Sequence, residues 1–581
     1  MRTYLKKIIK ISQLKKKQFV FVTIITLVLG LFEILSLGLL IPYINTVLQP
    51  SFLIEKIDIL AKYKLTDKQI VILSSSFILV VFFLKTIIQF YMQKYIILIC
   101  SKCQYELKLV LMNGYQNQLY LNFTENNSAS YFRSINQLSN QFAFSIFMPI
   151  LKILNDLFFL SIIVCILIFV NYQIVFFTIL ILLIFFLFFT KFFNKKLISY
   201  GLEINASTKK MIKIMNEAFT GFKEIRLLNK EKFFFNNLAE NAFIYFKKNK
   251  NKMVINSLPK ILLEFLAFFL LIILIFYTLI FDKNIQEYTP TITFFAFALI
   301  KIIPLVNSII NNFTQLKFSK NSLKLLDEDL NKFATKKKLL KNCKIDYFKN
   351  FKSIELKQIN FNFQNSKTKT LSNINFKILK GKSYGIFGPS GSGKTTLIDI
   401  LIGIIEPNSG KILINDRVIN YENRNYLKEK IAYLPQQVFI IDGTILENII
   451  LDENEDSIDI KKINHIIKIS DLESLIKKSQ YGLNTHVGEN GIKISGGQRQ
   501  KISIARSLYH DKNIFVIDEA TSNIDLKSEN KIVNDLNKLK LTNIIISHRS
   551  KSMLNCDYVY YMEDGKIIDC GKPGEIVQKY D

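Results

Sequence analysis

Long apolar runs, separated by polar segments, occupy most of the first 320 positions of the chain. A membrane-spanning helix needs about 20 mainly apolar residues. Six stretches are long enough, at roughly 19–47, 70–99, 146–170, 173–194, 256–281 and 289–317. The pattern therefore predicts a membrane domain of six long transmembrane helices over residues 1–325. Residues 326–350 are charged and are expected to form a linker, and residues 351–581 a separate α/β domain with strands such as 383–387 and helices such as 396–402.

Basic residues near the N-terminus predict how the membrane domain is oriented. Seven of them precede the first apolar stretch: Arg2, Lys6, Lys7, Lys10, Lys15, Lys16 and Lys17. Because positive charge is retained on the cytoplasmic side, the N-terminus is expected there, and six crossings return the chain to the same side. The first stretch is too long for a signal peptide and lacks a small-residue cleavage site. A multi-pass membrane protein with a cytoplasmic N-terminus and a cytoplasmic C-terminal domain is expected.

Composition narrows the possible partners. The formal net charge is +29, while half of the residues are hydrophobic. That hydropathy argues against a soluble nucleic-acid binder, so no nucleic-acid partner is expected, and the lysines are better explained by contact with anionic lipid head groups. The six cysteines give no disulfide framework. Cys100 and Cys103 form a lone C-x-x-C, which indicates one face of a helix rather than a zinc site.

A phosphate-binding loop is expected between the strand at 383–387 and the helix that follows. Its sequence has two glycines five positions apart, followed by Lys and Thr. Backbone N–H groups of such a loop point at phosphate oxygens, and the helix N-terminus adds positive potential. Lys394 is expected to reach the β- and γ-phosphates, and the Thr395 hydroxyl to ligate Mg²⁺. The predicted phosphate-binding residues are Gly388, Pro389, Ser390, Gly391, Ser392, Gly393, Lys394, Thr395 and Thr396.

Two carboxylates end the apolar strand at 514–518, where doubly wound sheets bind ligands. Asp518 is expected to hold Mg²⁺ through water, and Glu519 to orient and polarise the attacking water. Phosphoryl transfer depends mainly on positioning and on charge neutralisation, so a lysine, a metal and one carboxylate are its minimum set. ATP and Mg²⁺ are the expected cofactors.

With these motifs in place, residues from about 352 to 578 resemble the nucleotide-binding domain of an ABC transporter, and the chain as a whole is similar to a half-exporter of that family. The resemblance assigns adenine stacking to Phe363, Mg²⁺ sensing to Gln436, the D-loop to Asp525 and γ-phosphate contact to His548. It assigns the signature to four residues that close over nucleotide held by another subunit: Ser495, Gly496, Gly497 and Gln498. It therefore implies a homodimer with two ATP sites, and makes Glu519, His548 and Gln436 the catalytic set.

The sequence departs from this family at two positions and resembles it in one further segment. Ile494 replaces the usual Leu of the signature. The loop at 485–491 resembles one found in exporters, but His486 stands where a Glu is common. The segment 216–225 is similar to the short coupling helices that exporters rest on the ATPase domain.

Ionisable residues inside the predicted membrane helices indicate a substrate site, because such residues are costly there. They are Glu33, Lys85, Lys260, Glu264 and Lys301. One interpretation is a cavity whose lysines face an anionic substrate. The alternative is that Lys260 pairs with Glu264, and Glu33 with a lysine, to hold helices together.

Segments 32–44 and 257–264 resemble bacterial flippases of lipid-linked oligosaccharides. The resemblance implies ATP-driven flipping of a polyprenyl-pyrophosphate glycan across the inner membrane, for protein glycosylation or surface polysaccharide assembly. Two alternatives stay open. One is an exporter of drugs, peptides or lipid A on the same frame. The other is a domain that gates a channel or regulates a partner without transport.

Overall fold

The computed structural model describes most of the chain, in segments 11, 16–48, 66–124, 128–280, 285–334, 351–363, 369–419, 424–451, 458–518, 535–536, 538–547 and 553–580. The chain forms two compact units. One contains residues 1–118 and 124–335, and the other contains residues 119–123 and 336–581. The short segment 119–123 therefore belongs to the C-terminal unit, although it lies between two long helices of the N-terminal unit.

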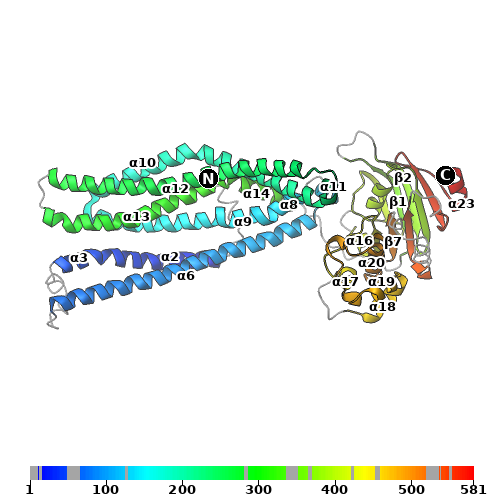
Figure 1. Cartoon of the computed structure of the whole chain (residues 1–581), viewed down its shortest axis with the longest axis horizontal. Helices are drawn as coiled ribbons and strands as arrows, with labels where there is room; N and C mark the ends of the chain where they lie inside the picture. Colours follow the sequence, from blue (N-terminus) through cyan, green and yellow to red (C-terminus); the bar gives the residue numbers. More distant parts are fainter. Residues whose placement is uncertain are drawn as a thin grey trace. The chain divides into compact units, whose positions relative to one another are not determined.

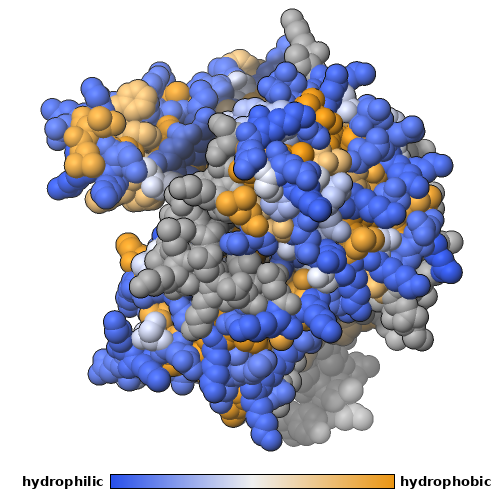
Figure 2. All heavy atoms as spheres, turned by 90° about the vertical axis from the view of Figure 1, so that its right-hand side faces the viewer, coloured by the Kyte–Doolittle hydropathy of each residue, from blue (hydrophilic) through white to orange (hydrophobic). Residues whose placement is uncertain are grey.

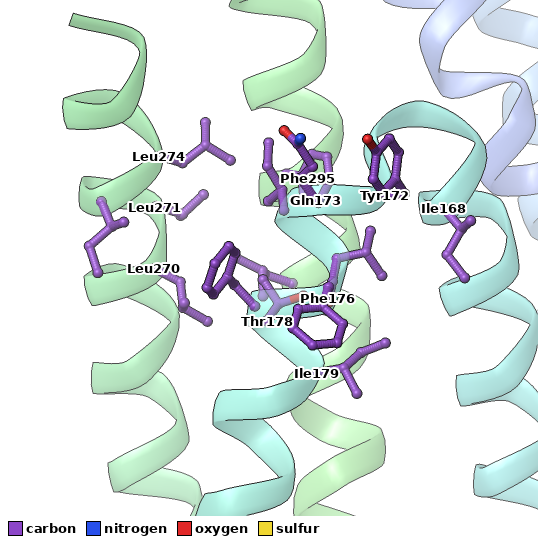
Figure 3. A pocket seen from close by; sticks show the side chains of 15 residues that line it. Ile168, Tyr172, Gln173, Phe176, Thr178, Ile179, Leu270, Leu271, Leu274 and Phe295 are labelled. Carbon is purple, nitrogen blue, oxygen red and sulfur yellow. Dashed lines mark hydrogen bonds between the residues drawn. The ribbon is translucent and has the colours of Figure 1, made fainter. Parts of the chain in front are cut away.

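Helices make up the described part of the N-terminal unit (Figure 1). The long ones are α2 (Lys16–Gly38), α6 (Asp67–Gln116), α10 (Met148–Thr220), α12 (Glu231–Ile280) and α13 (Ile285–Phe318). Shorter ones are α3 (Leu40–Leu48), α8 (Ser128–Phe132), η1 (Arg133–Leu138), α9 (Ser139–Phe142), η2 (Ala143–Phe147), α11 (Phe222–Leu227) and α14 (Lys320–Ala334). Helix α7 (Tyr120–Thr124) falls almost wholly in segment 119–123 of the C-terminal unit. The chain reverses direction within α10, near Tyr172, so this helix supplies two membrane-crossing segments (Figure 3).

Five helices of the described residues are long and apolar enough to cross a membrane: 67–116, 128–169, 172–220, 231–276 and 292–318. The first of the six expected segments corresponds to α2, where the apolar stretch Val20–Ser36 is shorter than a full span. Within the described residues, the prediction of six long transmembrane helices is thus met for five. All five extend into polar sequence, because a helix continues beyond the bilayer wherever no helix breaker stops it.

Packing leaves a large apolar surface on these helices. One buried cluster joins α2 and α6 to the start of α10, and includes Leu107, Phe142 and Leu326. A second joins α10, α12 and α13 around Ile163, Leu263 and Phe294. Many phenylalanines on the same helices stay exposed. Side chains that pack inward on one face and remain apolar on the other are typical of helices surrounded by lipid.

Helix α14 occupies part of the range expected to be a linker. It runs to Ala334 and buries Leu323 and Leu326 in the cluster that it shares with α6 and α9. The N-terminal unit accordingly ends near Thr335 rather than at residue 325. The charged sequence of α14 conceals a helix because its apolar residues form only a narrow stripe, which burial against neighbouring helices stabilises.

The C-terminal unit contains two sheets (Figure 1). One is antiparallel with the order β2-β1-β4-β5, from strands β1 (Ser353–Phe361), β2 (Leu371–Leu379), β4 (Ser409–Ile414) and β5 (Arg417–Val418). The other has the order β10-β9-β3-β8-β7-β6, from β3 (Ser383–Phe387), β6 (Ile431–Leu434), β7 (Ile514–Asp518), β8 (Thr542–Ile546), β9 (Tyr558–Glu563) and β10 (Lys566–Gly571). Its helices are α15 (Lys394–Leu401), α16 (Asn425–Lys430), α17 (Ile445–Ile450), α18 (Ile460–Ile469), α19 (Glu473–Lys478), α20 (Gly496–Tyr509) and α23 (Pro573–Tyr580).

The second sheet is parallel except at its edge strand β10. All five residues of β3 and the first four of β7 are buried, as expected for strands covered on both faces. This confirms the predicted α/β domain. Figure 2 views the molecule from the side of this domain, whose visible surface is mainly hydrophilic with scattered apolar residues.

Candidate functional site

The sequence motifs converge on one edge of the parallel sheet. Strands β3, β8, β7 and β6 are neighbours in that order and run in the same direction. Their carboxyl ends therefore lie along one edge, where open α/β sheets bind ligands. The loop at Gly388 follows β3, Asp518 ends β7, and Gln436 follows β6 after one proline.

Glycine conformations shape the loop between β3 and α15. Gly388 has φ +151°, and a Cβ there would lie 1.9 Å from the Met562 carbonyl oxygen. Gly393, which caps α15, has φ +96°, a region that residues with a side chain rarely adopt. A side chain at either position would push the loop out of shape. These glycines allow the backbone to wrap closely enough to cradle phosphate groups.

The Lys394 side chain lies inside this loop. It is 7% exposed, and its ammonium donates hydrogen bonds to the carbonyl oxygens of Gly388 (2.9 Å) and Pro389 (2.8 Å). Lys394 is also the first residue of α15, where backbone N–H groups have no acceptor within the helix. A buried ammonium and a helix N-terminus thus meet at one place. The arrangement can bind a polyphosphate.

Asp518 belongs to a small network of polar groups. Its Oδ2 accepts a hydrogen bond of 2.7 Å from the Tyr433 hydroxyl of β6. Asp399, on α15 one turn after Thr395, lies close enough to repel it. Burial, aided by the charge of Asp518, raises the pKa of Asp399 to about 6. Burial, and then the bond to Asp518, also raises the pKa of Tyr433.

This donor set fits a magnesium ion. Mg²⁺ prefers oxygen ligands and binds through one or two carboxylates together with substrate phosphates. Thr395 supplies a hydroxyl at the start of α15, and Asp518 a carboxylate at the end of β7. Asp399 and Asp518 place two carboxylates close together, and a divalent cation would relieve their repulsion.

Phe363 and Gln436 are two further residues of the predicted nucleotide site. Phe363 is 40% exposed just beyond β1, and its ring centroid lies 4.9 Å from that of Phe361. An exposed ring that is held from one side can stack on a base with its other face. Gln436 is exposed beyond β6. Both positions are compatible with their expected roles, which no contact in the structure tests.

The signature residues form the N-terminus of α20. Ser495 is the N-cap: its hydroxyl accepts from the Gln498 N–H (3.3 Å), and the Gln498 side chain accepts from the Ser495 N–H (2.8 Å). This capping box orients the first turn of the helix. The Ser495 side is exposed, so the positive end of the helix is available to an anion.

The loop around His486 is tied to the segment that follows Gln436. Thr444 and His486 form an antiparallel bridge, and Val487 N–H bonds to the Gly443 carbonyl at 2.9 Å. His486 itself is exposed. The backbone rather than the imidazole therefore holds this loop, which explains why the sequence can carry His where Glu is common.

Three predicted site residues, Glu519, Asp525 and His548, lie outside the described residues. Their positions follow β7 or β8 in the sequence, and their roles stay predictions. The remaining ATP-site residues fall on the loop after β3, on the ends of β1, β7 and β6, or at the start of α20, as described above.

Comparisons with known proteins agree with this division. A family model described as the ABC transporter transmembrane region matches residues 19–305, and one described as ABC transporter matches residues 371–522. The chain carries both domains of an ABC transporter. It has the layout of a half-exporter, with one transmembrane region fused to one ATPase domain, and it is a multi-pass membrane protein.

Two curated relatives illustrate the similarity. A Rickettsia typhi protein, named as an export ATP-binding/permease protein, is 40% identical over 222 residues, 38% of either chain. The heterocyst differentiation ATP-binding protein HepA of Nostoc is 32% identical over 290 residues, 50% of this chain and 47% of HepA. The matched part thus spans less than half of the length of these relatives.

A solved structure extends the likeness to the whole chain. A bacterial Atm1-family ABC exporter with ATP bound superimposes with a TM-score of 0.81, at 18% identity, over 97% of this chain and 96% of that chain. The superposition establishes a shared fold. It says nothing about a shared substrate.

The predicted substrate residues of the ABC transporter membrane domain separate into two groups. Glu33 of α2 and Lys85 of α6 are both 7% exposed and form an ion pair, and the Lys85 ammonium also donates to Ser36 Oγ at 3.3 Å. The ammonium groups of Lys85 and Lys301 each lie 5.6 Å from the centroid of the Phe82 ring. Three helices thus bring together two positive charges and one negative charge, which we call the charge cluster.

Lys260 and Glu264 do not join the charge cluster. They lie one turn apart on α12, with their charged atoms 4.0 Å apart, and their side chains are 68% and 54% exposed. Both ion pairs expected under the second alternative are therefore present. Lys260 pairs with Glu264 and Glu33 pairs with a lysine, while Lys301 adds a further positive charge beside the second pair.

An apolar cavity of about 920 Å³ lies among α10, α12 and α13 (Figure 3). Segments of α10, α12 and α13 line it, including Phe176, Leu270 and Leu299. Leu299 and Lys301 are two positions apart, and so point about 200° away from each other around α13. The cavity and the charge cluster are therefore separate features.

Sequence reasoning missed Tyr433, Asp399 and this cavity. Tyr433 stands three residues before Gln436, where an aromatic residue in a strand normally indicates core packing. Asp399 falls within an apolar helix, a position that could have been noticed as a buried carboxylate. The cavity has no sequence signal because it depends on how three helices pack.

Proposed function

We propose that two copies of this chain form an ATP-driven exporter of the bacterial inner membrane, and that its cargo is an anionic, lipid-linked molecule of the polyprenyl-pyrophosphate glycan class. One observation carries the ATPase part: the phosphate loop, Asp518 and Gln436 lie at one edge of one sheet, in a chain that also carries five long apolar helices. The proposal places the N-terminus and the ATPase domain in the cytoplasm.

Each ATP-site residue has a distinct task in this proposal. Lys394 and the first turn of α15 bind the phosphates, and Thr395 and Asp518 hold Mg²⁺, which when bound neutralises charge on the phosphate oxygens. Glu519 orients water, while Gln436 and His548 respond to the state of the γ-phosphate. The signature around Ser495 closes over nucleotide held by the second copy. The positive end of α20 can then bind the phosphate groups of that nucleotide.

The charge cluster supports an anionic cargo. Glu33 neutralises only one of the two lysines near Phe82, so the cluster carries one net positive charge within the membrane span. An unbalanced charge in this environment is costly and is a lead to function. A pyrophosphate would balance it. On the opposite face of α13, the apolar cavity has a lining that suits part of a hydrocarbon chain.

The test is ATP hydrolysis by the purified full chain in proteoliposomes. We expect phosphate release to increase with added polyprenyl-pyrophosphate glycan, and not with drugs, peptides or lipid A. We expect Lys301→Met to remove that increase while leaving basal hydrolysis intact. Lys317→Met is the matched control, because Lys317 lies on the same helix near a Phe313 ring, outside the charge cluster, and should behave as wild type.

Other results would redirect the proposal. Stimulation by drugs, peptides or lipid A instead of the glycan lipid would support an ATP-driven exporter but assign it a different cargo. Steady hydrolysis without movement of any cargo would favour a regulatory role. Absence of hydrolysis under all conditions would overturn the proposal as a whole.

A further inference from the structure

Asp518 must keep one orientation in order to serve as a metal ligand. A carboxylate has about four acceptor positions on its two oxygens, and the side chain can rotate among them. In this chain Asp399 adds a second negative charge nearby, which favours rotation of Asp518 away from it. A hydrogen bond from a donor on a fixed backbone would oppose that rotation.

Tyr433 supplies the hydrogen bond that can do so. Its hydroxyl donates to Asp518 Oδ2 at 2.7 Å, a hydrogen bond that restrains rotation of the carboxylate. Strands β6 and β7 are direct neighbours, with Tyr433 opposite Val516 and Leu434 opposite Ile517. The hydroxyl therefore approaches Asp518 from a fixed backbone position rather than from a mobile loop.

The Tyr433 ring is in turn held by packing within the C-terminal unit. It lies against the core cluster that contains Ile398 and Leu427, and Leu121 of segment 119–123 packs against the same cluster. Tyr120 of that segment is among the charged or polar neighbours of the Tyr433 hydroxyl. The segment follows α6 by two residues, so a membrane helix is covalently joined to the surroundings of Tyr433.

We propose that Tyr433 is a positioning residue: its hydroxyl fixes Asp518 for Mg²⁺, and the docked segment 119–123 keeps Tyr433 in place. The inference rests on the ATPase activity proposed above and adds a residue to it. Hydrogen-bond partners of metal-binding groups commonly change metal affinity 10- to 100-fold when they are removed. The effect on Mg²⁺ should therefore exceed the effect on ATP itself.

The test compares Tyr433→Phe with Tyr560→Phe in the full chain. Each variant loses one hydroxyl from a buried or half-buried ring in the sheet, but Tyr560 donates to the Lys377 carbonyl, 3.0 Å away and remote from Asp518. Binding of Mn²⁺ in the presence of a non-hydrolysable ATP analogue is measured by electron paramagnetic resonance. We expect about a 10-fold weaker affinity for Tyr433→Phe, and wild-type affinity for Tyr560→Phe.

Activity gives the second readout. For Tyr433→Phe the Mg²⁺ concentration at half-maximal hydrolysis should rise about 10-fold, while excess Mg²⁺ restores the maximal rate. Tyr120→Ala should shift the Mg²⁺ requirement in the same direction, and should add little to Tyr433→Phe in the double variant. Unchanged Mn²⁺ affinity in Tyr433→Phe, with an active wild type, overturns the inference alone. An inactive wild type counts against the ATPase proposal instead.

Discussion

Glu33 and Lys85 illustrate how a single residue pair can hold a membrane domain together and also serve a cargo. Their ion pair links α2 to α6, and each side chain is 7% exposed. Removing one partner of a buried pair leaves an uncompensated charge and typically costs about 3–5 kcal/mol, whereas replacing both is often close to neutral. The two roles can therefore be separated.

We predict that Lys85→Met strongly lowers the thermal stability of the full chain in detergent, because Glu33 is then left unpaired. Glu33→Gln combined with Lys85→Met should recover most of the loss, as measured by the melting temperature. The double variant should still lack stimulation by an anionic lipid if Lys85 also serves the cargo. Normal stimulation in a stable double variant would assign the pair to structure alone.

Asp399 carries a prediction about pH. Burial raises its pKa from 3.8 to about 6, so the charged form is disfavoured in the folded state. The resulting loss of stability is fully present above pH 6 and absent below the unfolded value. Asp399→Asn should therefore raise the melting temperature at about pH 8 without Mg²⁺ or nucleotide, and the gain should vanish near pH 4.

Asp569 provides a control of opposite sign. The nearby Lys579 ammonium lowers the pKa of Asp569, so its contribution to stability is present above the unfolded pKa and is lost as the pH falls. Asp569→Asn should lower the melting temperature at about pH 8, by a small amount because the pair is exposed. A gain from Asp399→Asn that did not depend on pH would contradict the assigned cause.

At the scale of elements, regular patterns were predictable and tertiary contacts were not. Apolar runs located α6, α10, α12 and α13, because burial in lipid requires length and hydrophobicity that any window of sequence reveals. The sequence did not predict helix α14 or the docking of segment 119–123. Helix α14 is an amphipathic helix in charged sequence, and segment 119–123 is too short to show a period.

The features of the site also divide into those that the sequence predicts and those that it does not. The loop around Lys394 could be located from its glycines, because they are required by its backbone conformation. The bond between Tyr433 and Asp518 could not, since it depends on β6 lying beside β7 although about 80 residues separate them in the chain. Contacts across strands far apart in sequence carry no local signal.

The N-cap of α20 allows the stability of this helix to be tested separately from its role in ATP hydrolysis. Ser495→Ala removes the capping hydroxyl, and Asp459→Ala removes the cap of α18, whose side chain accepts from the Lys462 N–H at 3.0 Å. Each should cost about 1 kcal/mol of stability. Only Ser495→Ala should also strongly reduce ATP hydrolysis, measured as phosphate release, because its helix belongs to the proposed site.

Equal loss of activity in the two variants would show that hydrolysis simply follows stability. Retained activity in Ser495→Ala, with α20 destabilised as expected, would mean that the signature hydroxyl does not contact nucleotide. The two caps are suited to this comparison because both lie in helices of the same unit and both accept from a backbone N–H.

At the scale of the whole molecule, the chain holds one phosphate loop and one signature, so closure of a site requires a second copy in the proposed mechanism. Glu519→Gln keeps the shape of the side chain while removing its ability to act as a base. It should allow ATP and Mg²⁺ to bind but not to react. The trapped state is then a pair of chains that holds its nucleotide.

We therefore predict that Glu519→Gln retains ATP through gel filtration with Mg²⁺, at a molar mass of two chains, and releases no phosphate. Lys394→Ala should retain no nucleotide, because the ammonium that lies against the loop carbonyls is the main charge available to the phosphates. Adding Lys394→Ala to Glu519→Gln should abolish retention as well. A Glu519→Gln protein that stayed monomeric with ATP, or hydrolysed it at the wild-type rate, would refute the paired site, since the trapped complex requires both a second chain and a missing base.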